Sequence, residues 1–273
     1  MSKNLNWVYL PLFLIIGFAI IPFLWMALSS FKTLAELYRI PVTILPDQPT
    51  FENYRKVLYE SNIPRYFLNS TIVSLGSTAL GLVFAIPASY AFARMRFRSS
   101  VFWQVCVLVA HLLPSATLIV PLYIMLGYFG LLNTLLGLTL VYTVLTLPLS
   151  IWMLTSYFRH IPPELEEAAF IDGASRWGIL FRIMLPLSLP GIVVIVLYSF
   201  VATWNEFIFA LTFANDTSVK TLPIGLAEFS TEYNTDWGAI MAASVIMTLP
   251  IAAIFLLLQK VFVGGLMSGA MKG

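Results

Sequence analysis

The sequence predicts an all-α integral membrane protein. Of its 273 residues, 59% are hydrophobic and only 10% are charged, and the mean hydropathy is +0.88. Soluble domains carry about 25% charged residues, so this chain has too few charges to cover a water-facing surface. Six segments are also apolar over the length of about 20 residues that a membrane-spanning helix needs.

The six predicted spans are separated by polar or proline-containing segments. They run near Trp7–Ser30, Tyr66–Ala93, Val101–Leu126, Thr134–Phe158, Ile183–Phe213 and Gly238–Gln259. The first span follows Lys3, as a secretory signal would. Its apolar run exceeds the 7–15 residues of a signal core, and it lacks a clear small-residue cleavage site, so we expect it to be retained.

Prolines inside these spans predict bent helices. A proline frees a backbone carbonyl that a neighbouring helix or a cavity must satisfy. Several together favour a bundle that bends around a central pathway and changes shape. They are Pro22, Pro87, Pro114, Pro121, Pro148, Pro190 and Pro250.

The distribution of basic residues predicts the orientation. The short loop from Arg94 to Arg98 holds three arginines and no acid, which indicates the cytoplasmic side. With six spans, both termini and the polar loop between the fourth and fifth spans are then cytoplasmic. We expect a multi-pass protein of a bacterial or archaeal cytoplasmic membrane.

Several function classes find no support in the sequence. The net charge of +2 is too small to indicate a nucleic-acid partner, and the one cysteine, Cys106, gives no disulfide framework. There is no phosphate-cradling G-x-x-x-x-G-K-[ST] loop and no H-E-x-x-H metal site. We therefore expect no catalytic, cofactor or metal residues on this chain, and any ATP hydrolysis to occur on another.

The polar loop from Arg159 to Pro186 predicts two short helices separated by a glycine. Pro162 and Pro163 suit a first helical turn, and the acids that follow face the positive end of the helix dipole. Gly173 is placed to end the first helix in a left-handed conformation. The product is a charged, structured knob between two spans.

The knob resembles the EAA loop of binding-protein-dependent ABC transporter permeases. It matches that motif through Glu167-Ala168-Ala169, then Gly173 after three intervening residues, and then Ile183-x-Leu185-Pro186. The resemblance implies a type I ABC importer permease with six transmembrane helices, whose loop forms a coupling helix that docks on an ATP-hydrolysing subunit.

Other segments extend the resemblance to MalG-type permease subunits of carbohydrate importers. They are Asn69–Thr71, Pro87–Arg94, Trp204–Phe207, Thr221–Leu226 and the ending Gly264–Gly273. The family relation implies a second, MalF-like permease, two ATP-binding cassette subunits that hold ATP and Mg²⁺, an extracytoplasmic solute-binding protein and a sugar substrate.

The resemblance also assigns roles to particular residues. The residues implied in coupling to the ATPase are Glu164, Glu167, Ala168, Ala169, Asp172 and Gly173. The glycine-rich tail, through Ser268, Gly269 and Lys272, would reach toward the ATPase dimer interface. Simple fraying is the alternative for a terminal segment.

Polar residues at membrane depth suggest a substrate path. Trp204, Asn205 and Glu206 place an aromatic face beside amide and carboxyl groups, which suits a sugar, and ionisable groups in spans usually face a cavity. The alternative is a hydrogen bond to a partner helix. His111 in the third span is predicted to be structural.

The extracytoplasmic segments and the domain division complete the prediction. Residues 31–65 are expected to be irregular, with a short helix around Phe51–Tyr59, and to cap the spans; contact with a partner on the outside is the alternative. Residues 214–237, with Asp216, Glu228, Glu232 and Asp236, are the better candidate for touching a solute-binding protein. We divide the chain into 1–65 (first span and external segment), 66–260 (core permease, with the EAA loop at 159–186) and 261–273 (cytoplasmic tail).

Two alternatives remain open from the residues. One is an ABC permease for another solute, such as glycerol phosphoesters, amino acids or peptides. The other is an ion-coupled secondary transporter that uses Glu206 as its carboxylate, although no internal repeat is evident and the cytoplasmic knob would be unexplained.

Overall fold

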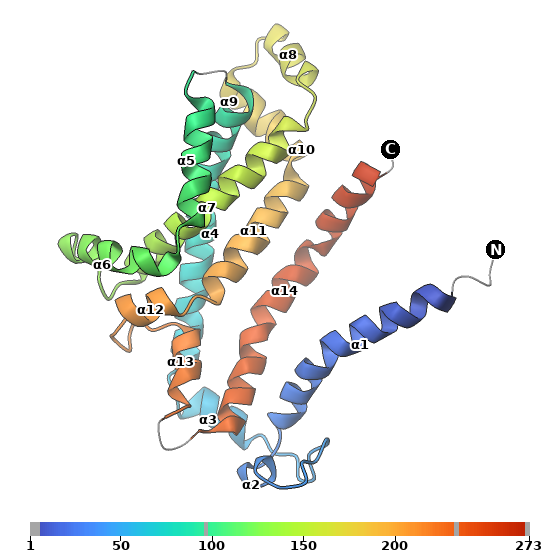
Figure 1. The fold of residues 1–273 in the computed structure, drawn as a ribbon, viewed down its shortest axis with the longest axis vertical. Coiled ribbons are helices and arrows are strands. Elements are labelled where there is room, and N and C mark those ends of the chain that lie inside the picture. The colour runs from blue at the N-terminus through green and yellow to red at the C-terminus, as the bar shows by residue number, and fades with distance from the viewer. Residues whose placement is uncertain (1–5, 96–97, 232–234, 271–273) are drawn as a thin grey trace. The chain divides into compact units, whose positions relative to one another are not determined.

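The computed structural model describes residues 6–95, 98–231 and 235–270, with the backbone alone for 6–8 and 261–270. Helices joined by irregular loops form the described part of the chain (Figure 1). The chain forms two compact units, Met1–Phe67 with Leu222–Pro250, and Leu68–Thr221 with Ile251–Gly273. Each unit is described by itself.

Four of the predicted spans are single helices. They are α1 (Asn6–Ser29), α4 (Ile63–Arg94), α7 (Leu135–Arg159) and α14 (Trp237–Ala270). Each contains a stretch that is long and apolar enough to cross a membrane. Prolines lie inside all four, as predicted: Pro22, Pro87, Pro148 and Pro250.

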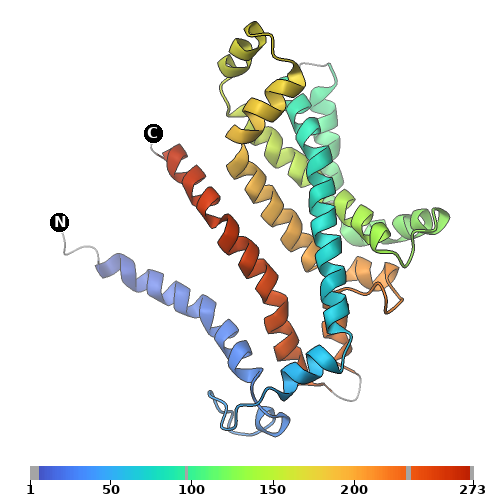
Figure 2. The same cartoon turned by 180° about the vertical axis from the view of Figure 1, so that it is seen from behind.

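The third predicted span, Val101–Leu126, is not one helix. It is α5 (Ser100–Leu112), the short 3₁₀ helix η1 (Ser115–Leu118) and α6 (Ile119–Tyr128), and the two halves meet at 98°. The break lies at Pro114. Leu113 has the extended ψ of 134° that a residue before proline prefers, so α6 leaves at a large angle to α5 (Figures 1 and 2). Leu126 of α6 is buried beside Leu138 of α7.

The fifth predicted span, Ile183–Phe213, is also broken. Helix α9 (Arg176–Ile179) precedes it. The span itself consists of a π-helical turn η2 (Leu180–Met184), α10 (Leu185–Leu187), α11 (Leu189–Trp204) and α12 (Ile208–Phe213). A bend of 79° separates Arg176–Leu187 from Leu189–Trp204. Pro186 and Pro190 flank it, and a proline cannot donate the hydrogen bond that would continue the helix.

Three short helices belong to the first unit: α2 (Leu34–Leu37), α3 (Glu52–Tyr59) and α13 (Leu222–Glu228). The predicted helix around Phe51–Tyr59 is confirmed as α3. Two buried charges, Lys32 and Glu36, were not expected in this external segment.

Glu36 and Lys32 organise the loop that contains them. Glu36 Oε1 accepts hydrogen bonds from the Asp47 amide and the Thr43 hydroxyl, both at 2.8 Å. Lys32 donates to the Thr43 carbonyl. The Asp47 amide, followed by the Thr43 hydroxyl and the Lys32 charge, holds the pKa of Glu36 below its usual value despite burial. These contacts order a segment that composition alone predicts to be irregular.

Helix α7 is the centre of the second unit. Its buried face carries small polar side chains that bond to neighbouring helices, the arrangement expected where lipid offers no hydrophobic drive for association. Ser89 on α4 donates to the Ile151 carbonyl at 3.0 Å, and Ser150 and Ser199 join α7 to α11 at 3.3 Å. Two apolar clusters extend this core, one around Tyr142 and Phe213 and the other around Phe158 and Ile179.

Gly191 permits the close approach of α11 to α7. A Cβ at this position would lie 2.6 Å from the Tyr157 ring, so we expect Gly191→Ala to destabilise the fold by about 1–3 kcal/mol through overpacking. Gly81→Ala on α4 is the control, because its Cβ would meet no atom within 4 Å. Thermal unfolding of the detergent-solubilised chain measures both, and equal midpoints would contradict this packing.

Asp236 ties α3 to the start of α14. Its Oδ1 accepts from the Ala239 amide at 3.0 Å, and its Oδ2 pairs with Lys56. Burial raises the pKa of Asp236, but the Lys56 hydrogen bond and the Ala239 and Gly238 amides outweigh it, so the pKa lies below 3.8.

We expect Asp236→Ala to cost about 1 kcal/mol at neutral pH, the usual cost of losing a helix cap. Because its folded pKa is depressed, the carboxylate stabilises the fold above its unfolded pKa and loses that contribution as the pH falls below it. The gap between wild type and Asp236→Asn should therefore close below pH 3.8. A gap in unfolding midpoint that does not depend on pH would contradict the assignment.

Candidate functional site

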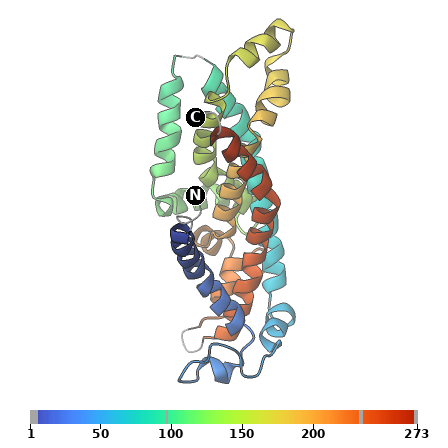
Figure 3. The ribbon, with the colours of Figure 1, turned by 90° about the vertical axis from the view of Figure 1, so that its right-hand side faces the viewer.

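The predicted knob is formed by helix α8, Glu164–Ile171. Gly173 has φ +81° and ends it in the left-handed conformation. The Gly173 amide bonds to the Phe170 carbonyl at 3.0 Å and the Ala174 amide to the Ala169 carbonyl at 2.9 Å, which is a glycine-based helix stop. The expected short helix, glycine break and second short helix (α9) are therefore confirmed. Figure 3 shows α8 at the end of the second unit where α4 finishes.

One face of α8 is presented to solvent. We call it the docking face, and it consists of Glu164, Glu167, Ala168, Ile171 and Asp172. The Ile171 side chain is 87% exposed. Leu165 and Phe170, next to this face, are each 45% exposed, so α8 presents several apolar side chains together, and an exposed apolar patch is typical of a protein interface.

Two of the residues implied in coupling stand apart from this face. Gly173 is exposed just beyond it, where it sets the turn. Ala169 is 8% exposed and packs in the chain's own core beside Phe158 and Ile179. Its small size is thus explained by internal packing.

The inward face of α8 carries a buried carboxylate, Glu166. Its Oε1 pairs with Arg94 and its Oε2 accepts from the Tyr90 hydroxyl at 3.0 Å. Arg94 also donates through Nη2 to the Ile161 carbonyl at 2.6 Å. The sequence resemblance singled out neither Arg94 nor Glu166 for a role, although both lie within the matched segments.

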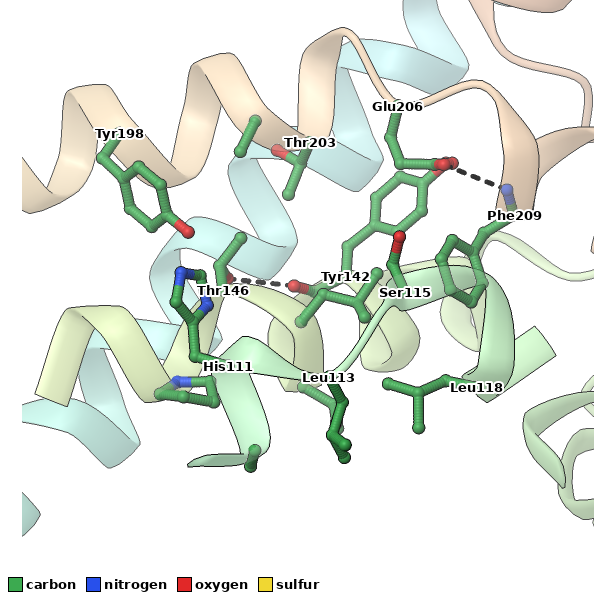
Figure 4. Close-up of a pocket in the computed structure, with 15 residues that line it drawn as sticks. His111, Leu113, Ser115, Leu118, Tyr142, Thr146, Tyr198, Thr203, Glu206 and Phe209 are labelled. Carbon is green, nitrogen blue, oxygen red and sulfur yellow. Dashed lines mark hydrogen bonds between the residues drawn. The ribbon is translucent and has the colours of Figure 1, made fainter. Parts of the chain in front are cut away.

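A cavity of about 520 Å³ lies elsewhere in the second unit. Its walls come from α5, η1, α7, α11 and α12, so both broken spans contribute to it (Figure 4). Much of the lining is apolar. The polar members are His111, Ser115, Tyr142, Thr146, Tyr198, Thr203 and Glu206.

Glu206 is the carboxylate of this cavity. It accepts from the Tyr142 hydroxyl at 2.7 Å, and from the amides of Phe209 and Ala210 at 3.0 and 3.1 Å. It therefore caps the N-terminus of α12 and joins α12 to α7. A capping carboxylate is stabilised by the amides that it accepts from, which explains how this side chain is accommodated in the break after α11.

The other two residues predicted for the substrate path do not line the cavity. Trp204 is fully buried and stacks on Phe200 with ring centroids 5.4 Å apart. Asn205 is exposed and donates to the Val201 carbonyl at 2.8 Å. Of the three, only Glu206 lines this cavity, because the helix ends at Trp204 and the three side chains diverge. Their shared place on the substrate path stays a prediction.

The cavity instead gathers polar groups from separate helices. His111, predicted to be structural, lines it, and so do Tyr142 and Tyr198. Figure 4 shows His111 and Tyr198 on opposing helices. The sequence signal for Tyr142 and Thr146 was their spacing of four residues, which places both on one face of α7.

The two remaining groups of predicted residues are less fully described. Ser268 and Gly269 lie on α14, whose backbone is helical to Ala270, and Lys272 lies outside the described residues. Glu232 also lies outside them. Asp216 and Glu228 are exposed, whereas Asp236 is engaged with Lys56.

The family follows from comparison with known proteins. A model of the binding-protein-dependent transport system inner membrane component matches residues 77–267. The chain belongs to this family. Its apolar helices and this membership make it a multi-pass inner-membrane permease.

Similar curated proteins cover nearly the whole permease. The sulfoquinovosyl glycerol transport system permease protein SmoH of Agrobacterium fabrum is 36% identical, over 100% of this chain and 95% of its own. The trehalose/maltose transport system permease protein MalG of Thermococcus litoralis is 39% identical, over 92% and 91%. The diacetylchitobiose uptake system permease protein NgcG of Streptomyces coelicolor is 34% identical, over 93% and 84%.

Solved structures confirm the fold. A chain of a bacterial ABC transporter involved in the import of the acidic polysaccharide alginate superposes with a TM-score of 0.79 at 20% identity, covering 95% of this chain and 98% of its own. A chain of the MetNI methionine ABC transporter gives 0.57 at 16% identity, over 74% and 95%. The permease therefore has the all-α fold of ABC importer permeases.

Proposed function

We propose that this permease is a subunit of an ATP-driven, binding-protein-dependent importer of a sugar or oligosaccharide. It forms half of the translocation pathway and couples to ATPase subunits through α8. The observation that carries the proposal is the docking face of α8, a structured and exposed acidic and apolar surface in a chain of this family. An ion-coupled transporter leaves that surface unexplained.

The proposed partners are two ATPase subunits, a second permease and a solute-binding protein. ATP and Mg²⁺ are bound and hydrolysed on two separate ATPase subunits, and this chain is not catalytic. A second, homologous permease completes the pathway. The solute-binding protein contacts the extracytoplasmic segment 214–237, where Asp216 and Glu228 are exposed. The Ser268, Gly269 and Lys272 tail reaches the ATPase dimer.

The orientation places both termini in the cytoplasm. Arg94, the first residue of the basic segment, contacts Glu166 at the root of α8, so the end of α4 and the coupling loop lie at the same end of the second unit. Basic loops stay on the cytoplasmic side, where ATP is available, and the two arguments agree.

The cavity is the proposed solute path on this subunit. Phenol rings can cover the C–H faces of a sugar, while the carboxylate and hydroxyl groups take its hydroxyl groups. Glu206 is the main acceptor, with Tyr142, Tyr198 and His111 around it. The named cargoes of the relatives above are carbohydrates or carbohydrate derivatives, which supports the same class here.

Co-purification from native membranes in mild detergent tests the proposal. We expect a complex with a second permease and ATPase chains, whose ATP hydrolysis rises with a sugar-loaded binding protein. Stimulation only by a binding protein loaded with a phosphoester, amino acid or peptide would overturn the sugar assignment. A chain that purifies alone and whose solute transport is driven by an ion gradient would overturn the assignment to ATP-driven importers.

A further inference from the structure

We propose that Tyr90, Arg94 and Glu166 act as a strut that makes α8 and the cytoplasmic end of α4 move as one body when the ATPase moves α8. These three side chains are positioning residues, and none of them belongs to the docking face. The inference rests on the proposed function, because it concerns how motion of the docked ATPase reaches the spans.

The strut holds both ends of the turn that connects α7 to α8. Arg94 reaches the Ile161 carbonyl at 2.6 Å, just after α7, and the Glu166 carboxylate, in the first turn of α8. Tyr90 lies one helical turn before Arg94 on the same face of α4 and donates to the second oxygen of Glu166 at 3.0 Å. A rotation of α8 about this turn would have to break these bonds.

Burial makes the strut costly to break. The side chains of Arg94 and Glu166 are only 14% and 7% exposed. Separating a buried ion pair leaves a charge without compensation, which is far more unfavourable than losing an exposed pair. The Arg94 guanidinium also has a planar fork that serves two acceptors at once, as a lysine ammonium on a flexible stem cannot do with the same geometry.

Apolar packing surrounds these bonds on the same elements. The Tyr90 ring meets Phe158 edge-on with centroids 6.3 Å apart. Ile161 and Ala169 are buried in the same cluster. The root of α8 is therefore fixed to α4 and α7, while its docking face is exposed for a partner. With this arrangement a displacement of α8 is transmitted to the spans and is not absorbed by a flexible loop.

The test measures whether α8 moves with α4. Spin labels at Phe170→Cys and Val83→Cys, in a Cys106→Ser background, report the α8–α4 distance in the purified complex with its ATPase and partner permease. Both label sites are exposed and lie outside the strut and the docking face. Distances are recorded without nucleotide and with Mg²⁺, ATP and vanadate.

The strut variants are Glu166→Gln, Arg94→Lys and Tyr90→Phe. The control is Arg182→Gln, which changes an exposed arginine of the same loop.

In the wild type and in Arg182→Gln we expect one narrow distance that trapping does not change. In Glu166→Gln and Arg94→Lys the distance should shift or broaden on trapping, and Tyr90→Phe should give a smaller effect. Uptake per ATP, measured in proteoliposomes with the sugar recovered on the binding protein, should fall at least about fivefold, the low end of typical coupling between sites. The double exchange Arg94→Glu with Glu166→Arg should restore part of it.

Three outcomes would overturn the strut: a wild-type distance that changes on trapping, a Glu166→Gln distance that does not, or unchanged uptake per ATP in both Glu166→Gln and Arg94→Lys. If Glu166→Gln does not assemble, Arg94→Lys and Tyr90→Phe decide by the same readouts. A wild-type complex that fails to hydrolyse ATP would instead count against the proposed function.

Discussion

Replacing Glu167 with alanine is expected to uncouple transport from ATP hydrolysis while leaving the membrane fold intact. Glu167 is exposed on the docking face of α8, so the chain's own packing does not depend on it. Removing one member of a hydrogen-bonded charge pair at an interface costs about 2–5 kcal/mol, which corresponds to a loss of affinity of more than about tenfold.

Gly173→Asp is expected to have the same effect by another route. Gly173 adopts φ +81°, a conformation that aspartate and asparagine tolerate better than other side chains. The added carboxylate would enter the docking surface next to Asp172. Gly173→Asn is the matched control, because it has the same backbone tolerance and nearly the same shape without the charge.

ATP hydrolysis and uptake measured in the same proteoliposomes check both variants. Retained ATPase activity with uptake reduced by about tenfold or more would support α8 as the coupling element. Normal uptake by both Glu167→Ala and Gly173→Asp would contradict that assignment. Equal losses of uptake in Gly173→Asp and Gly173→Asn would show that the size of the added side chain, and not its charge, reduces coupling.

Glu206→Ala is expected to abolish transport and to lower stability. The variant removes the cap of α12, worth about 0.5–2 kcal/mol, and leaves the Tyr142 hydroxyl without its acceptor, at about 1–3 kcal/mol. Both contacts are formed by one carboxylate, so the two losses occur together. Thermal unfolding and uptake measure them separately.

Glu206→Gln distinguishes the structural role of Glu206 as a helix cap from a role in contacting the solute. Glutamine keeps one acceptor oxygen, which can serve Tyr142 and Ala210, but its NH2 group cannot accept from the Phe209 amide. We therefore expect a smaller loss of stability than in Glu206→Ala, together with reduced uptake. Thr212→Ala on α12 is the control, because the Thr212 hydroxyl bonds only within its own helix, to the Ile208 carbonyl at 2.8 Å. If Glu206→Gln transports at the wild-type rate, the carboxylate serves only as a helix cap and is not part of the solute path.

The coupling loop could be predicted from sequence because its determinants are local. Proline before the helix, acids in its first turn and glycine after its end act through the backbone within a few residues. The structure accordingly forms α8 over Glu164–Ile171 with Gly173 as its stop. The apolar spans were predictable for the same kind of reason, since hydropathy is read along the chain.

The breaks in the spans were only partly predictable. The prolines were recognised as sites of bending, but the size of each bend depends on what the neighbouring helices accept. Hydropathy joins Val101 to Leu126 and Ile183 to Phe213 without interruption, yet the halves meet at 98° and at 79° within those stretches.

Sequence by itself determined the membrane class, the coupling helix and its end, and the presence of a carboxylate near Trp204. Only the tertiary structure decided that Trp204 belongs to the core, that Glu206 shares a cavity with Tyr142, and that Glu166 is bound to Arg94 and Tyr90. The pairs in these contacts are separated by 64, 72 and 76 residues. Such contacts are set by the packing of whole helices, which no local pattern of residues specifies.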